Sequence, residues 1–230
     1  MKNYLLIGGS SGIGLALAAL LAKEGNKVFA TYHESECQSS ENINYSQLDV
    51  RDENAKIEDI PDIIDGFIYC PGSINLKPFA RIKVQDFIDD YAFQVGGAIR
   101  LLQQVLPNLK KAESASVLFF STVAVQQGFN FHTQVASSKG AIEGLTRSLA
   151  NELSPKIRVN AIAPSLTDTP LAERLLNTEQ KREANAQRNP LQRIGQANDI
   201  AEMAAFLLSD KASWITGQIL AVDGGTSRIK

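Results

Sequence analysis

The stretch Ile7–Gly14, IGGSSGIG, joins an apolar run to an amphipathic one, and this junction determines the fold. The run YLLI at residues 4–7 has the length and composition of a buried strand. After the turn, apolar residues recur at helical spacing: Ile13, Leu17, Leu20 and Leu21. The sequence therefore predicts a strand, a glycine-rich turn and a helix that begins at about Gly12.

The residues of this turn have the properties of a phosphate-binding loop. Gly8 permits a tight turn, Gly12 lets the backbone approach a pyrophosphate, and Gly14 allows the helix to pack closely on the strand. The first turn of a helix also offers unpaired N–H groups and a positive dipole end to phosphates. Ser10 and Ser11 add hydroxyl donors. The strand before the glycines and the helix after them favour dinucleotide binding over a merely structural turn.

The rest of the chain alternates short strands with longer helices. Further strands are predicted at 27–32, 43–50, 66–70, 116–121, 157–163 and 219–222, and further helices at 84–111, 137–153 and 198–208. Such alternation implies βαβ units and a parallel sheet covered on both faces. We therefore expect an α/β fold: one doubly wound, Rossmann-like dinucleotide-binding domain over residues 1–230, with a mostly parallel seven-stranded sheet and helices on both faces.

Composition excludes several other classes of protein. The 230 residues carry a formal net charge of −2, which gives no field to attract nucleic acid or an anionic membrane. No apolar stretch reaches the ~20 residues of a membrane span, and glycines interrupt the apolar N-terminus before it could serve as a signal peptide. Cys37 and Cys70 match no ligand spacing and are interpreted as free thiols. We expect a soluble, cytoplasmic protein without a metal site.

The spacing Gly8-x3-Gly12-x-Gly14 resembles the short-chain dehydrogenase/reductase family, and the resemblance extends over nearly the whole chain. Asp49 in LDV matches an aspartate beside the adenine, and Gly72 in YCPG matches the last residue of an Asn-Asn-Ala-Gly turn. The segments RVNAIAPSLTDTPL, NPLQRIG, DIAEMAAFLLSD and WITGQILAVDGG resemble the family's C-terminal third. The turn and the resemblance together give the candidate cofactor-binding residues: Gly8, Ser10, Ser11, Gly12, Ile13, Gly14, His33, Asp49, Val50, Gly72, Lys139, Pro164 and Thr169.

The resemblance also implies a catalytic set of Asn, Ser, Tyr and Lys, and here the chain departs from the family. Lys139 matches the lysine that binds the nicotinamide ribose, but the tyrosine position four residues earlier is Val135, which cannot donate a proton. Thr122 stands at the serine position and keeps a hydroxyl for the substrate oxygen. Gln94 stands at the asparagine position and keeps an amide.

His132 is a possible replacement acid. It precedes Lys139 by seven residues, the spacing of the tyrosine in the family's enoyl reductase branch, and histidine titrates near neutral pH. A loop histidine beside Phe129 and Phe131 is, however, more often a packed or solvated residue than a catalytic one. Ser137 and Ser138 are typical of a helix N-cap, so the helix predicted at 137–153 is expected to begin at these serines.

Two functions therefore remain open. One is an NAD(P)-dependent oxidoreductase that acts on a small carbonyl or alcohol substrate through a non-standard proton relay, with Lys139, Thr122, His132 and Gln94 as candidate catalytic residues. The other is a cofactor-binding protein without turnover, acting as a sensor or an oligomer partner. The segment 166–189, expected to be a loop, would cover the substrate.

The cofactor and the assembly are also predicted. Strand 27–32 leads into His33 with no carboxylate at the position where NAD requires one, so His33 is a candidate donor to the 2′-phosphate of NADP, with NAD possible. Helices 84–111 and 137–153 carry more apolar residues than one sheet face can cover, including Phe87, Ile88, Tyr91 and Phe93. The resemblance implies association through the helices and the C-terminal DGG segment, and we expect a homotetramer, with a homodimer as the alternative.

Overall fold

The computed structural model, which describes residues 1–35 and 37–229, contains a seven-stranded sheet in the order β3-β2-β1-β4-β5-β6-β9. Every pair of neighbouring strands is parallel. The strands are β1 (Asn3–Ile7), β2 (Lys27–Tyr32), β3 (Ile43–Gln47), β4 (Gly66–Tyr69), β5 (Ala115–Phe120), β6 (Ile157–Pro164) and β9 (Ile219–Val222). The predicted doubly wound α/β fold is confirmed.

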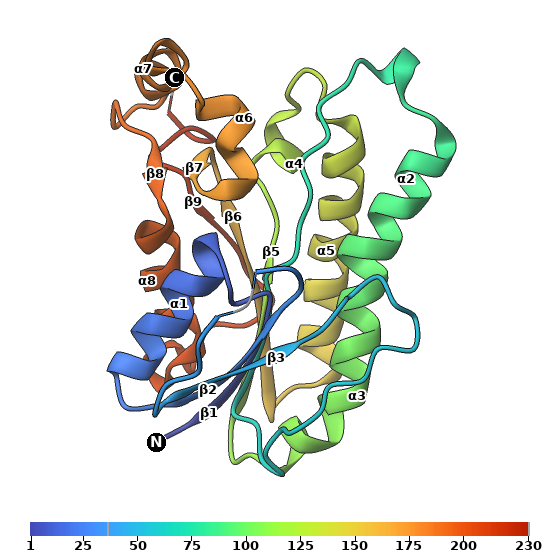
Figure 1. Ribbon diagram of the computed structural model, residues 1–230, viewed down its shortest axis with the longest axis vertical. Coiled ribbons are helices and arrows are strands. Elements are labelled where there is room, and N and C mark those ends of the chain that lie inside the picture. The colour runs from blue at the N-terminus through green and yellow to red at the C-terminus, as the bar shows by residue number, and fades with distance from the viewer. Residues whose placement is uncertain (36, 230) are drawn as a thin grey trace.

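Helices cover both faces of this sheet (Figure 1). One face packs against α1 (Gly12–Lys23) and α8 (Ala197–Leu208), and the other packs against α3 (Gly97–Lys111) and α5 (Thr133–Glu152). The chain starts in the middle of the sheet and winds outward in both directions, so the strand order reverses between β1 and β4. In such folds ligands bind outside the carboxyl ends of the strands at this reversal.

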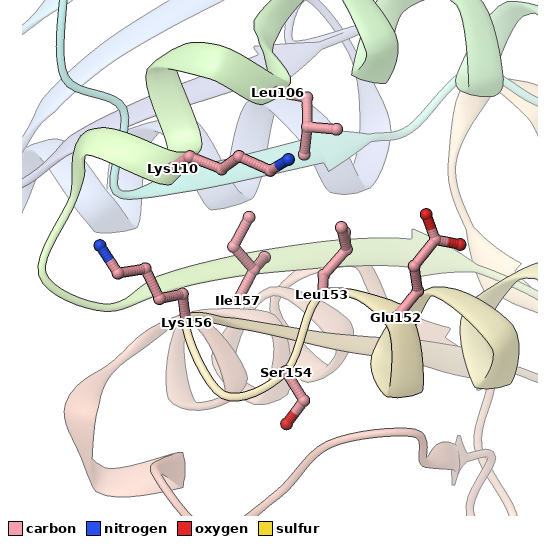
Figure 2. A pocket seen from close by; sticks show the side chains of 7 residues that line it. All are labelled: Leu106, Lys110, Glu152, Leu153, Ser154, Lys156 and Ile157. Carbon is pink, nitrogen blue, oxygen red and sulfur yellow. The ribbon is translucent and has the colours of Figure 1, made fainter.

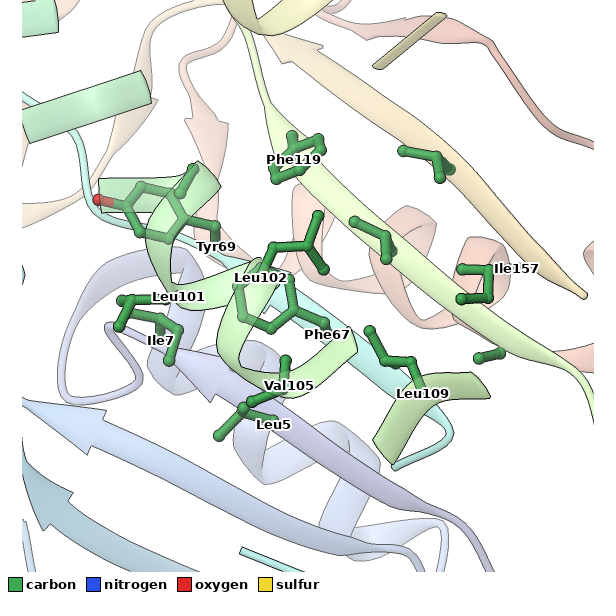
Figure 3. Close-up of a cluster of buried hydrophobic side chains, with 14 of the residues drawn as sticks. Leu5, Ile7, Phe67, Tyr69, Leu101, Leu102, Val105, Leu109, Phe119 and Ile157 are labelled. Carbon is green, nitrogen blue, oxygen red and sulfur yellow. The ribbon is translucent and has the colours of Figure 1, made fainter. Parts of the chain in front are cut away.

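Alternate residues of each strand enter two separate hydrophobic clusters, because successive side chains point to opposite faces. Leu5 and Ile7 of β1 pack on the α3 and α5 side, together with Phe67 and Phe119, as Figure 3 shows. Tyr4 and Leu6 belong to the cluster under α1 and α8. The central strands are buried on both faces, which explains why their sequences are apolar without alternation.

The predicted helix 84–111 is interrupted. It consists of α2 (Val84–Tyr91), a π-helical turn η2 (Ala92–Gly96) and α3. A residue of the sheet stabilises this wider turn: the hydroxyl of Tyr69, at the end of β4, donates to the carbonyl of Phe93 at 2.6 Å. The same hydroxyl lies 2.5 Å from the position that a β-carbon on Gly97 would take, so only glycine fits there.

Helix α5 begins at Thr133 rather than at Ser137, so the predicted serine caps are wrong. The N-cap position is His132, and both serines lie inside the helix. Ser137 Oγ donates to the carbonyl of Thr133 at 2.7 Å, and Ser138 is buried. The helix starts earlier because its first turn is supported by the rest of the molecule: Gln134 is buried there and donates to the backbone carbonyl of Asp86 at 2.8 Å.

The segment 166–189, expected to be a loop, is largely structured. A two-stranded parallel ribbon pairs β7 (Thr167–Asp168) with β8 (Gly195–Gln196), and α6 (Glu173–Leu176) and α7 (Glu179–Arg188) follow β7 above the sheet (Figure 1). The sequence did not predict α7 because this helix is polar all round and lacks the apolar stripe that indicates an amphipathic helix. The remaining elements are η1 (Phe79–Arg81), α4 (Ala124–Gln127), η3 (Pro170–Ala172) and η4 (Asp210–Ala212).

Within residues 1–35 and 37–229, no helix has both the length and the apolar character needed to cross a bilayer.

Candidate functional site

A cavity of about 920 Å³ opens at the carboxyl ends of the strands. Its walls come from segments far apart in the chain: the turn before α1, the residues after β4 and β5, the start of α5, and the segment after β6. This is the place where an open α/β sheet binds ligands.

The glycine turn forms one end of the cavity. Gly8 has a φ of +80°, a conformation that glycine adopts without strain, and its N–H donates to Thr31 Oγ1 at 3.0 Å. A β-carbon on Gly14 would lie only 2.1 Å from the Gly8 carbonyl oxygen, so any larger residue would push the helix away from the turn. The turn therefore has the close backbone approach that its sequence predicts.

Most of the candidate cofactor residues line this cavity. The lining includes Ser11, Gly12, Ile13, Gly14, Gly72, Lys139, Pro164 and Thr169. The candidates outside the lining are Gly8, Ser10, His33, Asp49 and Val50. Thr169 meets the turn directly, since its Cβ would be 3.3 Å from a β-carbon on Gly12.

His33 stands between two carboxylates just beyond the end of β2. Its Nε2 is 3.5 Å from Asp49 Oδ2, and its Nδ1 is 3.7 Å from Glu34 Oε1. Glu34, the residue after His33, therefore also lies in the region of the predicted ribose site. This part of the site combines one group able to contact a phosphate with two acceptors able to contact a hydroxyl.

Lys139 lies on the cavity wall and is only 8% exposed. Burial lowers the pKa of its ammonium from the usual value to about 8, and the charge of Asp90 and the thiol of Cys70 partly oppose this shift. Its Nζ lies 3.6 Å from the position of a β-carbon on Gly72. A lysine with a pKa near 8 can exchange protons at physiological pH.

Val135 precedes Lys139 by one helical turn and lines the same wall, with 6% of its surface exposed. Among the residues of the described chain that line the cavity there is no tyrosine. Tyr69, which directly precedes the lining residue Cys70, has its hydroxyl bound to Phe93, and burial raises the pKa of that phenol. Tyr45, which reaches the glycine turn, donates its hydroxyl to the carbonyl of Gly9 at 3.3 Å. No phenol therefore takes the place of the missing one.

Two other candidates, Thr122 and His132, also line the cavity. Thr122 Oγ1 accepts from the N–H of Ala124 at 3.3 Å, which leaves its O–H free to donate to a substrate oxygen. His132 Nδ1 donates to the carbonyl of Asn130 at 2.8 Å. In the neutral ring this bond leaves Nε2 as an acceptor, not a donor.

Gln94 is fully buried behind this wall and does not line the cavity. Its Nε2 donates to Asp90 Oδ2 at 2.7 Å, while its Oε1 has no hydrogen-bond partner within the described residues. Sequence reasoning missed Asp90, Ser73 and the role of Ser138, which meet around this amide. The signal available was that Asp90 precedes Gln94 by four residues and so shares its helix face.

A second, smaller cavity of about 390 Å³ lies at the opposite end of the sheet, where α5 leads into β6 (Figure 2). Leu106, Leu153 and Ile157 form its apolar wall, and Lys110 and Lys156 stand at its edge. It brings together none of the candidate catalytic or cofactor residues.

The chain matches the family model described as Enoyl-(Acyl carrier protein) reductase over residues 8–227. It is 31% identical to the 3-oxoacyl-(acyl-carrier-protein) reductase of Thermotoga maritima, covering 97% of each chain. It is 32% identical to a tropinone reductase homolog of Arabidopsis thaliana, covering 97% of this chain and 92% of that one.

Solved structures show the same relationship. The aldohexose dehydrogenase of Thermoplasma acidophilum superposes with a TM-score of 0.89 at 26% identity, over 98% of this chain and 94% of that one. ElxO with NADP bound superposes with a TM-score of 0.87 at 27% identity, over 98% and 99% of the two chains. The chain belongs to the short-chain dehydrogenase/reductase family, as its sequence predicts.

Proposed function

We propose that this protein is an NAD(P)-dependent oxidoreductase that interconverts a small carbonyl compound and its alcohol without a catalytic tyrosine. One observation carries the proposal: the glycine turn, Thr122 and Lys139 face one cavity whose wall has valine where the family has its proton donor. The relatives support the reaction type, since one is named a 3-oxoacyl-(acyl-carrier-protein) reductase and another an aldohexose dehydrogenase.

The residues of the site suit a dinucleotide. The N-terminus of α1 and the hydroxyls of Ser10 and Ser11 would hold the pyrophosphate, and Lys139 would hold the nicotinamide ribose. When bound, the nicotinamide supplies or accepts the hydride. The close contact at Gly14 supports this assignment, because it keeps the helix end against the turn, where phosphate oxygens can reach its N–H groups.

The chain's own residues would orient the substrate and control the proton. The free O–H of Thr122 would donate to the substrate oxygen. Phe129, Phe131 and Leu171 line the outer part of the cavity and suit an apolar substrate body. Val135 adds an apolar surface beside the reacting oxygen, so the proton must come from another group on this wall.

A second candidate function is supported by Val135 itself. A protein that binds the dinucleotide as a sensor, or as a partner in an oligomer, needs the glycine turn but no proton donor. Such a protein would bind NADP or NAD without oxidising or reducing any carbonyl or alcohol substrate.

Cofactor binding and turnover distinguish the two functions. We expect isothermal titration to detect NADP or NAD binding, and a panel of ketones and alcohols to give cofactor-dependent turnover. Crystals soaked with each cofactor should position the nicotinamide C4 beside Thr122 and Lys139. Binding without turnover on any substrate would favour the sensor.

For the cofactor we propose NADP, with NAD as the alternative, because His33 is a possible donor to a 2′-phosphate. Replacing His33 by Ala should weaken NADP binding several-fold and leave NAD binding nearly unchanged, as measured by calorimetry on both cofactors. Asp49 and Glu34 are acceptors that suit the ribose hydroxyls of NAD. Tighter binding of NAD, unaffected by His33→Ala, would therefore overturn the assignment.

A further inference from the structure

A buried carboxylate, that of Asp90, lies behind the cavity wall that carries Val135 and Lys139. Asp90, at the end of α2, is 6% exposed and accepts three side-chain hydrogen bonds. Oδ2 accepts from Gln94 Nε2 at 2.7 Å and from Ser138 Oγ at 2.5 Å, and Oδ1 accepts from Ser73 Oγ. These donors come from the π turn, from α5 and from the segment after β4, so the carboxylate joins three parts of the site.

Burying the Asp90 carboxylate costs folding free energy unless another group compensates for its charge. Transferring an ionised carboxylate out of water is strongly unfavourable without pairing, yet no cation in the described chain forms an ion pair with Asp90 within 4.0 Å. Its three partners are neutral donors. The cation that interacts with Asp90 electrostatically is Lys139.

Gln94 connects the two groups. Its amide N–H binds Asp90, which fixes the orientation of the amide and leaves Oε1 as the buried atom without a partner. Oε1 and Lys139 Nζ each lie 3.6 Å from the position of a β-carbon on Gly72, so both face the same small space. No hydrogen bond joins Oε1 to Lys139 within the described residues, but this fixed acceptor lies beside the space that the lysine ammonium borders.

Few other charges act on Lys139. Besides Asp90, the Cys70 thiol acts electrostatically on Lys139, but burial raises the pKa of this thiol to about 12, so that it is neutral at physiological pH. Glu143, one turn further along α5, is already bound by Ser121 at 2.8 Å and lies 3.8 Å from Arg147. His132, at the start of α5, lines the cavity and binds Asn130. Asp90 is thus the anion that acts on the lysine.

We propose that Asp90, acting through Gln94 and Ser138, is the positioning residue that keeps Lys139 protonated and aimed at the cavity, and that Lys139 supplies the proton that the family takes from tyrosine. This inference rests on the proposed oxidoreductase function. It gives a single account of the missing tyrosine, the buried carboxylate and the unpartnered glutamine oxygen.

The reduction balances with Lys139 as the acid. The carbonyl carbon gains a hydride, with two electrons, from the reduced nicotinamide, and the C=O π pair moves onto oxygen. A Nζ–H bond of Lys139 breaks and an O–H bond forms, giving the alcohol and a neutral lysine that regains a proton from water in the cavity. Val135 is shorter than tyrosine, and a water beside it would have Thr122, Lys139 and the substrate oxygen as partners.

The first test measures Lys139 without any cofactor. Competitive acetylation with acetic anhydride, followed by peptide mass spectrometry, gives the pH at which Lys139 becomes reactive. Asp90→Asn should shift this midpoint to lower pH by about one unit or more, because removing the anion favours the neutral amine. Ser73→Ala, which keeps the charge, should shift it much less. An unchanged midpoint in Asp90→Asn would overturn the proposal.

Thermal unfolding and circular dichroism check that the variants fold. If Asp90→Asn does not fold, Gln94→Met tests the same connection, since it removes the amide but keeps the side-chain volume. It should shift the midpoint in the same direction, by less. No shift in Gln94→Met would contradict the role of the amide.

The second test uses turnover. In the unmodified protein kcat/KM for carbonyl reduction should fall above about pH 8, and in Asp90→Asn the fall should come at lower pH. If kcat/KM falls at the same pH in Asp90→Asn as in the unmodified protein, the proposed function stands and this inference is overturned. A shifted acetylation midpoint in a protein that reduces no carbonyl would overturn the proposed function and the donor role, and leave only the Asp90–Lys139 coupling.

Discussion

At the scale of single residues, Val135 separates this chain from the chemistry that its family resemblance implies. It lies one helical turn before Lys139 and is packed into the cavity wall. Loss of a positioned acid typically costs about 10²–10⁴-fold in rate. The surrounding groups decide how much of this loss is recovered, and the buried lysine is the group best placed to do so.

Restoring the phenol should raise activity. We expect Val135→Tyr to increase ketone reduction by about 10-fold or more, since general acid catalysis contributes about 10²–10⁴-fold and the proposed lysine route would already recover part of that factor. Adding Thr122→Ser and Gln94→Asn should increase it further. The measurement is NADPH oxidation with a panel of ketones.

Val135→Phe is the matched control, because it adds the ring without the hydroxyl. Equal gains in both variants would mean that packing, not proton donation, causes the effect.

His132 should contribute little as an acid. Its Nδ1–H is bound to a backbone carbonyl and its ring packs edge-on against Phe129 at 5.5 Å, so Nε2 of the neutral form accepts rather than donates. We expect His132→Ala to lower kcat by less than about 10-fold, below the range of a lost general acid. A loss of 10²-fold or more in steady-state assays would identify histidine as the donor instead of Lys139.

At the scale of elements, the turn between β1 and α1 and the π turn η2 have the same physical basis. In each, a backbone segment approaches another group so closely that no β-carbon fits: Gly14 against Gly8, and Gly97 against Tyr69. The first contact holds a helix end where phosphates can bind. The second holds the wide turn that directs Gln94 toward Asp90 and Gly72.

Gly14→Ala should therefore weaken nucleotide binding strongly. Its methyl group would lie 2.1 Å from backbone, which cannot move as a flexible side chain can. We expect NADPH affinity to fall more than 10-fold in calorimetry, and the unfolding midpoint to drop by several degrees, since about 1 kcal/mol corresponds to 2–4 °C at this chain length.

Gly144→Ala is the control for the glycine-to-alanine change. It lies on α5 with nothing within 4 Å of the added carbon, and alanine favours helix over glycine by roughly 1 kcal/mol. This variant should bind the cofactor normally and unfold at an equal or higher temperature. Normal NADPH binding by Gly14→Ala would show that the turn does not hold the pyrophosphate.

At the scale of the whole molecule, we propose that the chain forms one dinucleotide-binding unit and that copies associate through α2 and neighbouring surfaces. Of the apolar residues that suggested association, Phe87 packs against Phe79, and Phe93 lies under the guanidinium of Arg51. Ile88 and Tyr91 remain 54% and 48% exposed on α2. Together with Val84, also on α2, they form the surface that carries this proposal.

Light scattering should give a homotetramer, or a homodimer as the alternative. Ile88→Lys should lower the mass at micromolar concentration, because a charge in an apolar interface is costly. Lys110→Ala, on α3 far from this surface, should not. A stable monomer of about 25 kDa in the unmodified protein would contradict the prediction.

The sequence by itself determined the order of strands and helices, the glycine turn and the four-residue spacing of Val135 and Lys139. Each depends on periodicity or steric limits within a few residues, which the local chain imposes wherever it folds. The features that the sequence did not predict are the π turn, the early start of α5 and the structured segment 166–189. None of them has a strong local sequence pattern. Their causes lie in Tyr69, Gln134 and the β7–β8 ribbon, which come from other parts of the chain.

Only the tertiary structure decided how the cavity wall around Lys139 is built. Asp90 and Gln94 are four residues apart and share a helix face, but Ser73 and Ser138 come from two other segments, and no spacing in the sequence brings these serines to Asp90. The charge of Lys139 likewise depends on burial and on Asp90, not on its own neighbours in the chain. Local conformation follows from short-range sterics and backbone hydrogen bonding, whereas the electrostatics of a buried site follow from which distant groups the fold removes from water together.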